Sequence, residues 1–167
     1  MKTVEQERVR SFEWADPAAA ARLAAGLSGL EVMQAIIDGR LPRPPFASAL
    51  GLEALEVEPG RALFAIEPAE WMYNPLGSVH GGIAATLLDT CMGCAVHTTL
   101  PAASGYTTTD LQVRYLRALQ VGDGRVLAEG RVVHAGRRTA TAEGRLFLAD
   151  DETALLAHGS TGCLILG

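Results

Sequence analysis

The chain has 167 residues, of which 49% are hydrophobic and 20% are charged, and its formal net charge is −5. This length and composition predict one domain with a proper hydrophobic core. The acidic balance argues against non-specific nucleic-acid binding, which requires a basic face. It leaves room for a local basic pocket that holds an anionic group.

No segment of the sequence predicts secretion or membrane insertion. The N-terminal residues 1–7 are polar and lack the apolar core of a signal peptide. A bilayer-spanning helix needs about 20 apolar residues, and the best candidate, 83–100, is interrupted by Asp89 and His97. We therefore expect a cytoplasmic protein that contacts neither membrane nor nucleic acid.

The three cysteines are Cys91, Cys94 and Cys163, an odd number that does not suggest a disulfide framework. Cys91 and Cys94 have the C-x-x-C spacing, but they lie inside an apolar helical pattern rather than at its start, where thiolates are stabilised. No second pair supplies the rest of a zinc site. We interpret the cysteines as packing residues and expect no metal and no cofactor.

The first part of the chain, residues 1–46, is predicted to be an N-terminal helical extension. Its first 16 residues are expected to be loosely docked, and the alanine-rich stretch 17–25 is helix-prone. A capping box that begins at Ser28 opens a second helix. The Pro-rich segment 42–45 predicts a stiff, extended strap that leads to the main domain, residues 47–167.

The main domain shows a strand pattern, then a helix pattern, then strands again. Two strands, 52–58 and 61–67, are predicted to form a hairpin around Pro59-Gly60. A helix is predicted over 81–98, and it is apolar nearly all round, which only a buried helix tolerates. Alternation and turn residues predict four more strands, at 107–115, 125–134, 139–148 and 155–165. Short turns between consecutive strands favour an antiparallel sheet that curls around the helix.

The predicted helix carries the most informative residues. From Trp71 to Thr109 the only formally charged side chain is Asp89, just over two turns into the helix. A lone buried carboxylate is costly unless it is hydrogen-bonded or used in chemistry. Gly81 and Gly82 open the helix, where free backbone N–H groups suit a developing oxyanion. Together these features predict the two halves of a hydrolytic site.

The order of these residues resembles a known family. Asn74, then His80-Gly81-Gly82, then Asp89 and a strand through Thr108 resemble the hotdog-fold acyl-CoA thioesterases, and most closely their phenylacetate-degradation branch. The resemblance covers about residues 47–165. It implies an α+β hotdog fold, with an antiparallel sheet wrapped around one long central helix. It also implies a homodimer, or a dimer of dimers, with active sites shared at the interface.

The resemblance implies a role for each of these residues. The Gly81 N–H would polarise the thioester carbonyl, and Asp89 of the partner subunit would act as general base on water or as nucleophile. Asn74 and His80 would hold the thioester or the loop, and Thr108 would help to place the water. Thioester hydrolysis by such a site needs a base, a positioned water and an oxyanion donor, and no metal.

A substrate-binding role is expected for three further residues, Gly82, Arg137 and Arg138. The two arginines follow the turn at Gly136 in an otherwise neutral stretch. They form either a solvated turn or a binding site for the nucleotide phosphates of coenzyme A, which need local positive charge in an acidic protein.

Two expectations concern the surroundings of Asp89. Its helical neighbours Ala85, Thr86 and Gly93 are small, so they are predicted to leave room for substrate. His97 lies at the far end of the helix, where a cation complements the helix dipole. We therefore assign His97 a structural role as a cation.

The predicted function is hydrolysis of acyl-CoA or aryl-CoA thioesters to the free acid and coenzyme A. One alternative is a hotdog dehydratase acting on acyl thioesters, which typically relies on a His–acid pair in a different pattern. The other is a non-catalytic acyl-CoA-binding or regulatory hotdog protein, against which Asp89 at the acid position argues. Asp89 as a purely structural carboxylate, and Gly81-Gly82 as a mere tight turn, are the simpler readings of the same residues.

Overall fold

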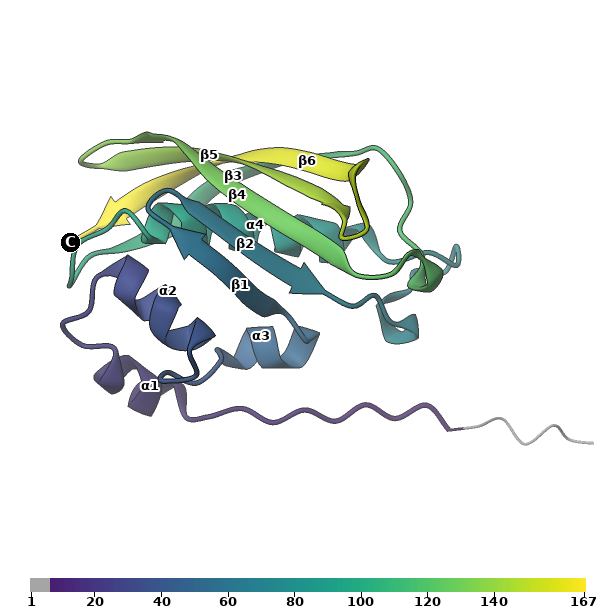
Figure 1. Cartoon of the computed structure of the whole chain (residues 1–167), viewed down its shortest axis with the longest axis horizontal. Coiled ribbons are helices and arrows are strands. Elements are labelled where there is room, and N and C mark those ends of the chain that lie inside the picture. Colours follow the sequence, from purple (N-terminus) through teal and green to yellow (C-terminus); the bar gives the residue numbers. More distant parts are fainter. Residues whose placement is uncertain (1–6) are drawn as a thin grey trace, which may run out of the picture.

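The computed structural model describes residues 7–167 and consists of one curved sheet wrapped around a central helix, with three short helices at one side (Figure 1). The strands are β1 (Glu53–Glu58), β2 (Arg61–Ile66), β3 (Gly105–Tyr115), β4 (Val126–Ala135), β5 (Thr139–Leu148) and β6 (Asp151–Leu166). They form one antiparallel sheet in the order β1-β2-β4-β5-β6-β3. The central helix is α4 (Gly81–His97), and the hotdog arrangement implied by the resemblance is confirmed.

The predicted strands and the long helix are therefore present, with most boundaries shifted by one or two residues. The main difference is β6, which begins at Asp151 rather than at 155. Short 3-10 turns, η1 (Glu70–Met72) and η2 (Val121–Asp123), lie in the loops on either side of the helix and β3. None of the helices in residues 7–167 combines the length and hydrophobicity that a bilayer span requires.

The N-terminal extension contains α1 (Pro17–Leu23) and α2 (Gly29–Ile37), and a third helix, α3 (Pro45–Leu50), crosses the predicted boundary between residues 46 and 47. The predicted capping box is confirmed, because Ser28 and Glu31 exchange hydrogen bonds at the start of α2. The sequence predicts an extended strap over residues 42–45, so a helix that begins at Pro45 differs from the prediction. Proline at a first helical position is favourable, so the strap ends where α3 begins.

The expectation of a loosely docked N-terminus applies to residues 1–16. Residues 1–6 lie outside the described part of the chain. Residues 7–16 form neither helix nor strand, and all of them are exposed. An ion pair between Arg8 and Glu70 and a cation–π contact of Arg10 with Trp71, at 3.8 Å, connect this segment to η1.

A row of glycines lets α4 lie directly on the sheet. Gly130 of β4 is paired with Gly144 of β5, which is paired with Gly159 of β6. A Cβ atom at Gly130 would overlap the backbone of Cys91, and one at Gly144 would lie 2.8 Å from Cγ of Met92. Larger residues at these positions would push the helix away from the strands. The row therefore sets the depth at which α4 sits.

The core fills the space between α4 and the sheet. Four side chains of the helix, Leu87, Leu88, Met92 and Val96, are completely buried. They pack among small and branched residues of the strands, and each large apolar side chain buried in this way contributes roughly 1.5–3 kcal/mol. This packing fixes the rotation of α4 and hence the direction in which its less buried residues face.

A bulge in β3 changes which side chains face the helix. Strict alternation over 107–115 would place Thr108 and Tyr115 on opposite faces of the sheet. The pairing with β6 instead shifts between Thr108 and Asp110, so that Thr109 is an extra residue. Such bulges re-aim the side chains that follow them. As a result Thr108 and Tyr115 both face α4, and the predicted alternation is wrong at this point.

The strand β3 lies at one edge of the sheet and pairs only with β6. Most of its residues are exposed. An exposed strand edge of this length presents unpaired backbone groups that can pair with another chain. This edge is consistent with the expected dimer.

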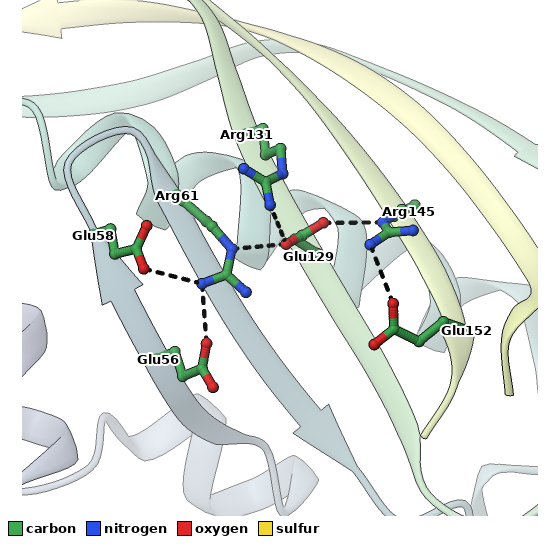
Figure 2. Close-up of polar contacts among 7 residues, drawn as sticks. All are labelled: Glu56, Glu58, Arg61, Glu129, Arg131, Arg145 and Glu152. Atoms are coloured by element: carbon green, nitrogen blue, oxygen red, sulfur yellow. Dashed lines mark hydrogen bonds and ion pairs between the residues drawn. The ribbon is translucent and has the colours of Figure 1, made fainter. Parts of the chain in front are cut away.

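The outer face of the sheet carries a network of charged side chains around Glu129 (Figure 2). The Glu129 side chain is only 4% exposed and accepts hydrogen bonds from Arg61 (2.7 Å), Arg131 (2.8 Å) and Arg145 (2.9 Å). Burial by itself raises the pKa of Glu129, but these three bonds outweigh it and lower the pKa to about 2. Further carboxylates, Glu56, Glu58 and Glu152, lie at the border of the network.

Replacing Glu129 with glutamine is expected to destabilise the fold by about 3 kcal/mol. This is the lower end of the loss on breaking a buried ion pair, because Arg131 and Arg145 reach solvent. A carboxylate whose pKa is lower when folded stabilises the protein above its ordinary pKa of 4.5, and this contribution disappears as the pH falls towards about 2.

Urea unfolding at several pH values measures both effects. Between pH 4.5 and 2 the wild type should lose stability more steeply than Glu129→Gln. The control is Glu143→Gln, since Glu143 is an exposed carboxylate of β5. Equal losses in the two variants would contradict a special role for Glu129.

Candidate active site

The loop that precedes α4 is organised by Asn74. Its side-chain oxygen accepts the N–H groups of Leu76 (2.8 Å) and Ser78 (3.3 Å), and its amide nitrogen donates to the Ser78 hydroxyl (3.1 Å). Asparagine commonly folds turns in this way. The predicted site residue Asn74 thus holds the loop that delivers the chain to the start of the helix.

His80 caps the N-terminus of α4. Its Nδ1 atom accepts the N–H of Gly82 at 2.9 Å, while its own backbone N–H donates to the carbonyl of Met72 at 2.8 Å. The Gly82 N–H is therefore already used. In residues 7–167 no acceptor bonds the Gly81 N–H, which points out of the positive end of the helix dipole.

Tyr115, at the end of β3, lies against Gly81. Its hydroxyl donates to the Gly81 carbonyl at 3.2 Å, and its ring would lie 3.3 Å from a Cβ atom at this position. A cavity of about 330 Å³ opens beside the same glycine. Its walls include Asn74, His80, Gly81, Tyr115, Leu146 and Ala157. A free backbone donor therefore lines a cavity large enough for part of a ligand.

Asp89 is half-buried on the side of α4 that faces β3. Its Oδ1 atom accepts a hydrogen bond from the Thr108 hydroxyl at 2.9 Å. No other donor within the described chain bonds the carboxylate, so Oδ2 is available to a water molecule or substrate. The structure thus brings together two of the predicted site residues, Asp89 and Thr108.

The two halves of the predicted site are well separated within one chain. Asp89 follows Gly81 by eight residues on the same helix, and at about 1.5 Å per residue the two backbones lie roughly 12 Å apart. A base must contact the water that attacks a carbonyl carbon, and an oxyanion donor must contact the oxygen of the same carbonyl, each at about 3 Å. One chain alone therefore does not bring Gly81 and Asp89 to the same carbonyl.

Comparison with known proteins gives the family. The thioesterase superfamily model matches residues 76–155. A solved protein of the thioesterase superfamily is 34% identical, with a TM-score of 0.65, and the match covers 81% of this chain and 97% of that chain. The chain belongs to the thioesterase superfamily. It is thereby classed with the thioester hydrolases.

Two other solved structures resemble this thioesterase-superfamily chain. The BH2602 protein from Bacillus halodurans, solved with CoA, is 32% identical over 75% of this chain and 80% of its own, with a TM-score of 0.66. A phenylacetic acid degradation-related protein from Ralstonia eutropha is 25% identical over 79% of this chain and 98% of its own, with a TM-score of 0.70.

Two curated relatives also match the thioesterase-superfamily chain. A protein from Halobacterium salinarum named as an esterase is 46% identical over 69 residues, which are 40% of this chain and only 44% of that protein. The 1,4-dihydroxy-2-naphthoyl-CoA hydrolase of Listeria monocytogenes is 25% identical over 107 residues, which are 64% of this chain and 83% of that enzyme.

The cysteines of this thioesterase-superfamily chain are confirmed as packing residues. All three are free, and Cys91 and Cys163 are buried. Burial raises the pKa of each thiol, to about 12 for Cys94, so none is a thiolate at neutral pH. In the described part of the chain no three His, Cys, Asp or Glu side chains gather in a way that could hold a metal ion.

Two expectations about the helix beyond Asp89 are wrong. Burial lowers the pKa of His97, so this histidine is neutral at neutral pH rather than a cation, and its ring packs at 5.8 Å from that of Tyr106. Gly93 does not leave an open space, because a Cβ atom there would lie 2.7 Å from the Tyr106 hydroxyl. The tyrosine ring occupies the space that was predicted for substrate.

Arg137 and Arg138 form the turn between β4 and β5, where both are exposed. The Arg138 carbonyl accepts the N–H of Ile165 at 2.9 Å, which ties this turn to β6. Ala140, two residues further, and Thr108 are both paired with Cys163 from opposite sides. The arginines therefore lie at the end of the sheet where Thr108 contacts Asp89, away from the cavity beside Gly81.

Tyr115 is not among the site residues that the sequence predicts. It belongs to the predicted strand 107–115, and unbroken alternation places it on the face opposite to Thr108. The bulge at Thr109 is what turns Tyr115 towards Gly81. Three consecutive threonines carry no signal that would mark which of them is the extra residue.

Proposed function

We propose that this protein hydrolyses acyl-CoA thioesters to the free acid and coenzyme A. The observation that carries this proposal is that two polar groups on α4 have hydrogen-bonding capacity left. The Gly81 N–H is a free donor beside a cavity, and the Asp89 carboxylate has one oxygen held by Thr108 and the other free. A donor for the oxyanion and a base for water are the groups that thioester hydrolysis requires.

We further propose that each active site is shared between two chains. Pairing of the exposed β3 edges would give a homodimer, or the pair within a dimer of dimers, and would bring Asp89 of the partner subunit towards Gly81. The separation of about 12 Å within one chain supports this arrangement. It also explains why the cavity beside Gly81 contains no carboxylate of its own.

In the proposed reaction the thioester carbonyl oxygen accepts the Gly81 N–H. Asp89 of the partner subunit takes a proton from a water molecule, which the Thr108–Asp89 hydrogen bond helps to orient, and the resulting hydroxide adds to the carbonyl carbon. The tetrahedral intermediate then collapses, its C–S bond breaks, and the thiolate of coenzyme A leaves and takes up a proton. Asn74 and His80 hold the loop and helix end that present the Gly81 donor.

The substrate is proposed to be an aryl-CoA or a compact acyl-CoA. The names of two relatives, one related to phenylacetic acid degradation and one a dihydroxynaphthoyl-CoA hydrolase, support testing aromatic thioesters first. Carboxylate, water and backbone donor are sufficient for the chemistry, so we propose that the enzyme needs no metal or cofactor and acts in the cytoplasm. A protein that only binds acyl-CoA would not need the free carboxylate oxygen of Asp89.

Asp89→Asn is expected to lower the hydrolysis rate by about 10²–10⁴-fold while the protein stays folded. The amide keeps the shape of the side chain but does not accept a proton, and general-base catalysis is worth roughly this factor. Phenylacetyl-CoA turnover and the melting temperature are the two measurements. Asp110→Asn, an exposed carboxylate on the outer face of β3, serves as control and should retain wild-type turnover. Near wild-type rates in Asp89→Asn would refute the proposed base.

The double variant Arg137→Ala, Arg138→Ala is expected to raise KM for acyl-CoA by about tenfold with kcat nearly unchanged. Contacts to the nucleotide phosphates are equally strong in ground state and transition state, and exposed charge contacts are individually weak. Steady-state kinetics with acyl-CoA measure this change in KM. A short thioester that lacks the nucleotide serves as the control, and its KM should stay the same. Arg43→Ala removes an exposed arginine of the strap and should change neither KM. An unchanged KM in the double variant would place the nucleotide elsewhere.

A further inference from the structure

Two adjacent pairs of residues lie where α4 faces β3. Asp89 and Gly93 lie one turn apart on the helix, and Thr108 and Tyr106 lie two residues apart on the same face of the strand. Thr108 donates to Asp89 at 2.9 Å, and Tyr106 packs on Gly93. The tyrosine ring is therefore the immediate neighbour of the Asp89–Thr108 pair on the side towards the C-terminus of the helix.

Tyr106 is firmly held in this position. A Cβ atom at Gly93 would lie 2.7 Å from its hydroxyl and 2.8 Å from Cε2, so the ring needs the glycine in order to fit. The His97 ring packs on it at 5.8 Å, and the Cys94 thiol lies within hydrogen-bonding reach of its hydroxyl. Burial raises the pKa of Tyr106, so the phenol is neutral at physiological pH. A ring fixed by three neighbours acts as a rigid wall.

The helix surface is less buried on the other side of Asp89. Towards Gly81 the helix presents the small residues Ala84, Ala85 and Thr86, all of them half-exposed. Past Asp89 the next turn is buried under Tyr106. In the proposed shared site the thioester carbonyl lies between Asp89 and Gly81 of the partner subunit. An acyl group that extends from there past Asp89 meets the tyrosine ring directly.

We propose that Tyr106, positioned by Gly93, is the end wall of the acyl site and limits how far the acyl group extends past Asp89. The inference rests on the proposed function, because the thioester carbonyl must lie near Asp89 for the acyl group to meet this wall. It assigns the enzyme to aryl and short acyl groups and excludes long straight chains. Tyr106 is a specificity-determining residue here, since its hydroxyl is turned towards Cys94 and takes no part in the reaction.

The test compares Tyr106→Ala with the matched variant Tyr106→Phe on a series from butyryl-CoA to dodecanoyl-CoA. Removing the ring opens space past Asp89, so Tyr106→Ala should raise the kcat/KM ratio of dodecanoyl to butyryl substrate at least tenfold, the discrimination that a few methylene groups give in an apolar pocket. Tyr106→Phe keeps the ring and should keep the wild-type chain-length profile. Tyr106→Leu provides a milder opening if the alanine variant does not fold.

A binding measurement separates this inference from the proposed function. Calorimetry with non-hydrolysable thioether analogues of butyryl-CoA and dodecanoyl-CoA reports the length limit without turnover. Tyr106→Ala or Tyr106→Leu should bind the long analogue at least tenfold more tightly than the wild type does, and the short one about equally. If the wild type hydrolyses no thioester but this shift in binding occurs, the proposed hydrolysis is refuted, and Tyr106 still limits the length of the bound acyl group. An unchanged length preference in both folded variants, in turnover and in binding, would overturn the role of Tyr106.

Discussion

The close approach of α4 to the sheet is the constraint on which the rest of this structure depends. Gly130, Gly144 and Gly159 form one row across three paired strands. The helix backbone at Cys91 fits against Gly130, and the side chains of Leu88 and Met92 fit against Gly144. Because the helix is pressed onto the strands, its rotation is fixed by the buried leucines and methionine. Gly81 then faces the end of β3, and Asp89 faces its bulged start. The site is a consequence of how deeply the helix sits.

The protein uses two buried or half-buried carboxylates in opposite ways. Glu129 is saturated by three arginines, which hold its pKa at about 2 and make it a fixed structural anion (Figure 2). Asp89 receives a single hydroxyl donor and keeps one oxygen free. A carboxylate held through both oxygens by three arginines is a poor proton acceptor, whereas one held at a single oxygen is oriented and has the other oxygen left for water. This difference in partners, rather than burial alone, distinguishes the structural acid from the candidate catalytic one.

The parts of the fold that local patterns determine could be predicted from the sequence. The hairpin at Pro59-Gly60, the capping box at Ser28 and the apolar helix from Gly81 each depend on neighbouring residues, and all are confirmed. The resemblance to the thioesterases implies that Asp89 and Thr108 belong to one site, and the hydrogen bond between them is a finding of the structure. What could not be predicted depends on contacts between distant segments. The bulge at Thr109 is fixed by pairing with β6, the neutral state of His97 follows from its burial, and the ring of Tyr106 takes the space at Gly93.

The central claim is that Gly81 of one chain and Asp89 of the partner subunit act on the same thioester. The most direct test mixes two inactive chains, one carrying Asp89→Asn and the other Asn74→Ala, which loses the hydrogen bonds that shape the loop before α4. In a mixed dimer one site combines an intact loop with an intact Asp89 of the partner, so co-expressed chains should regain roughly a quarter of wild-type hydrolysis on random pairing. A mixture as inactive as its two parents, although mixed dimers form, would contradict the shared site.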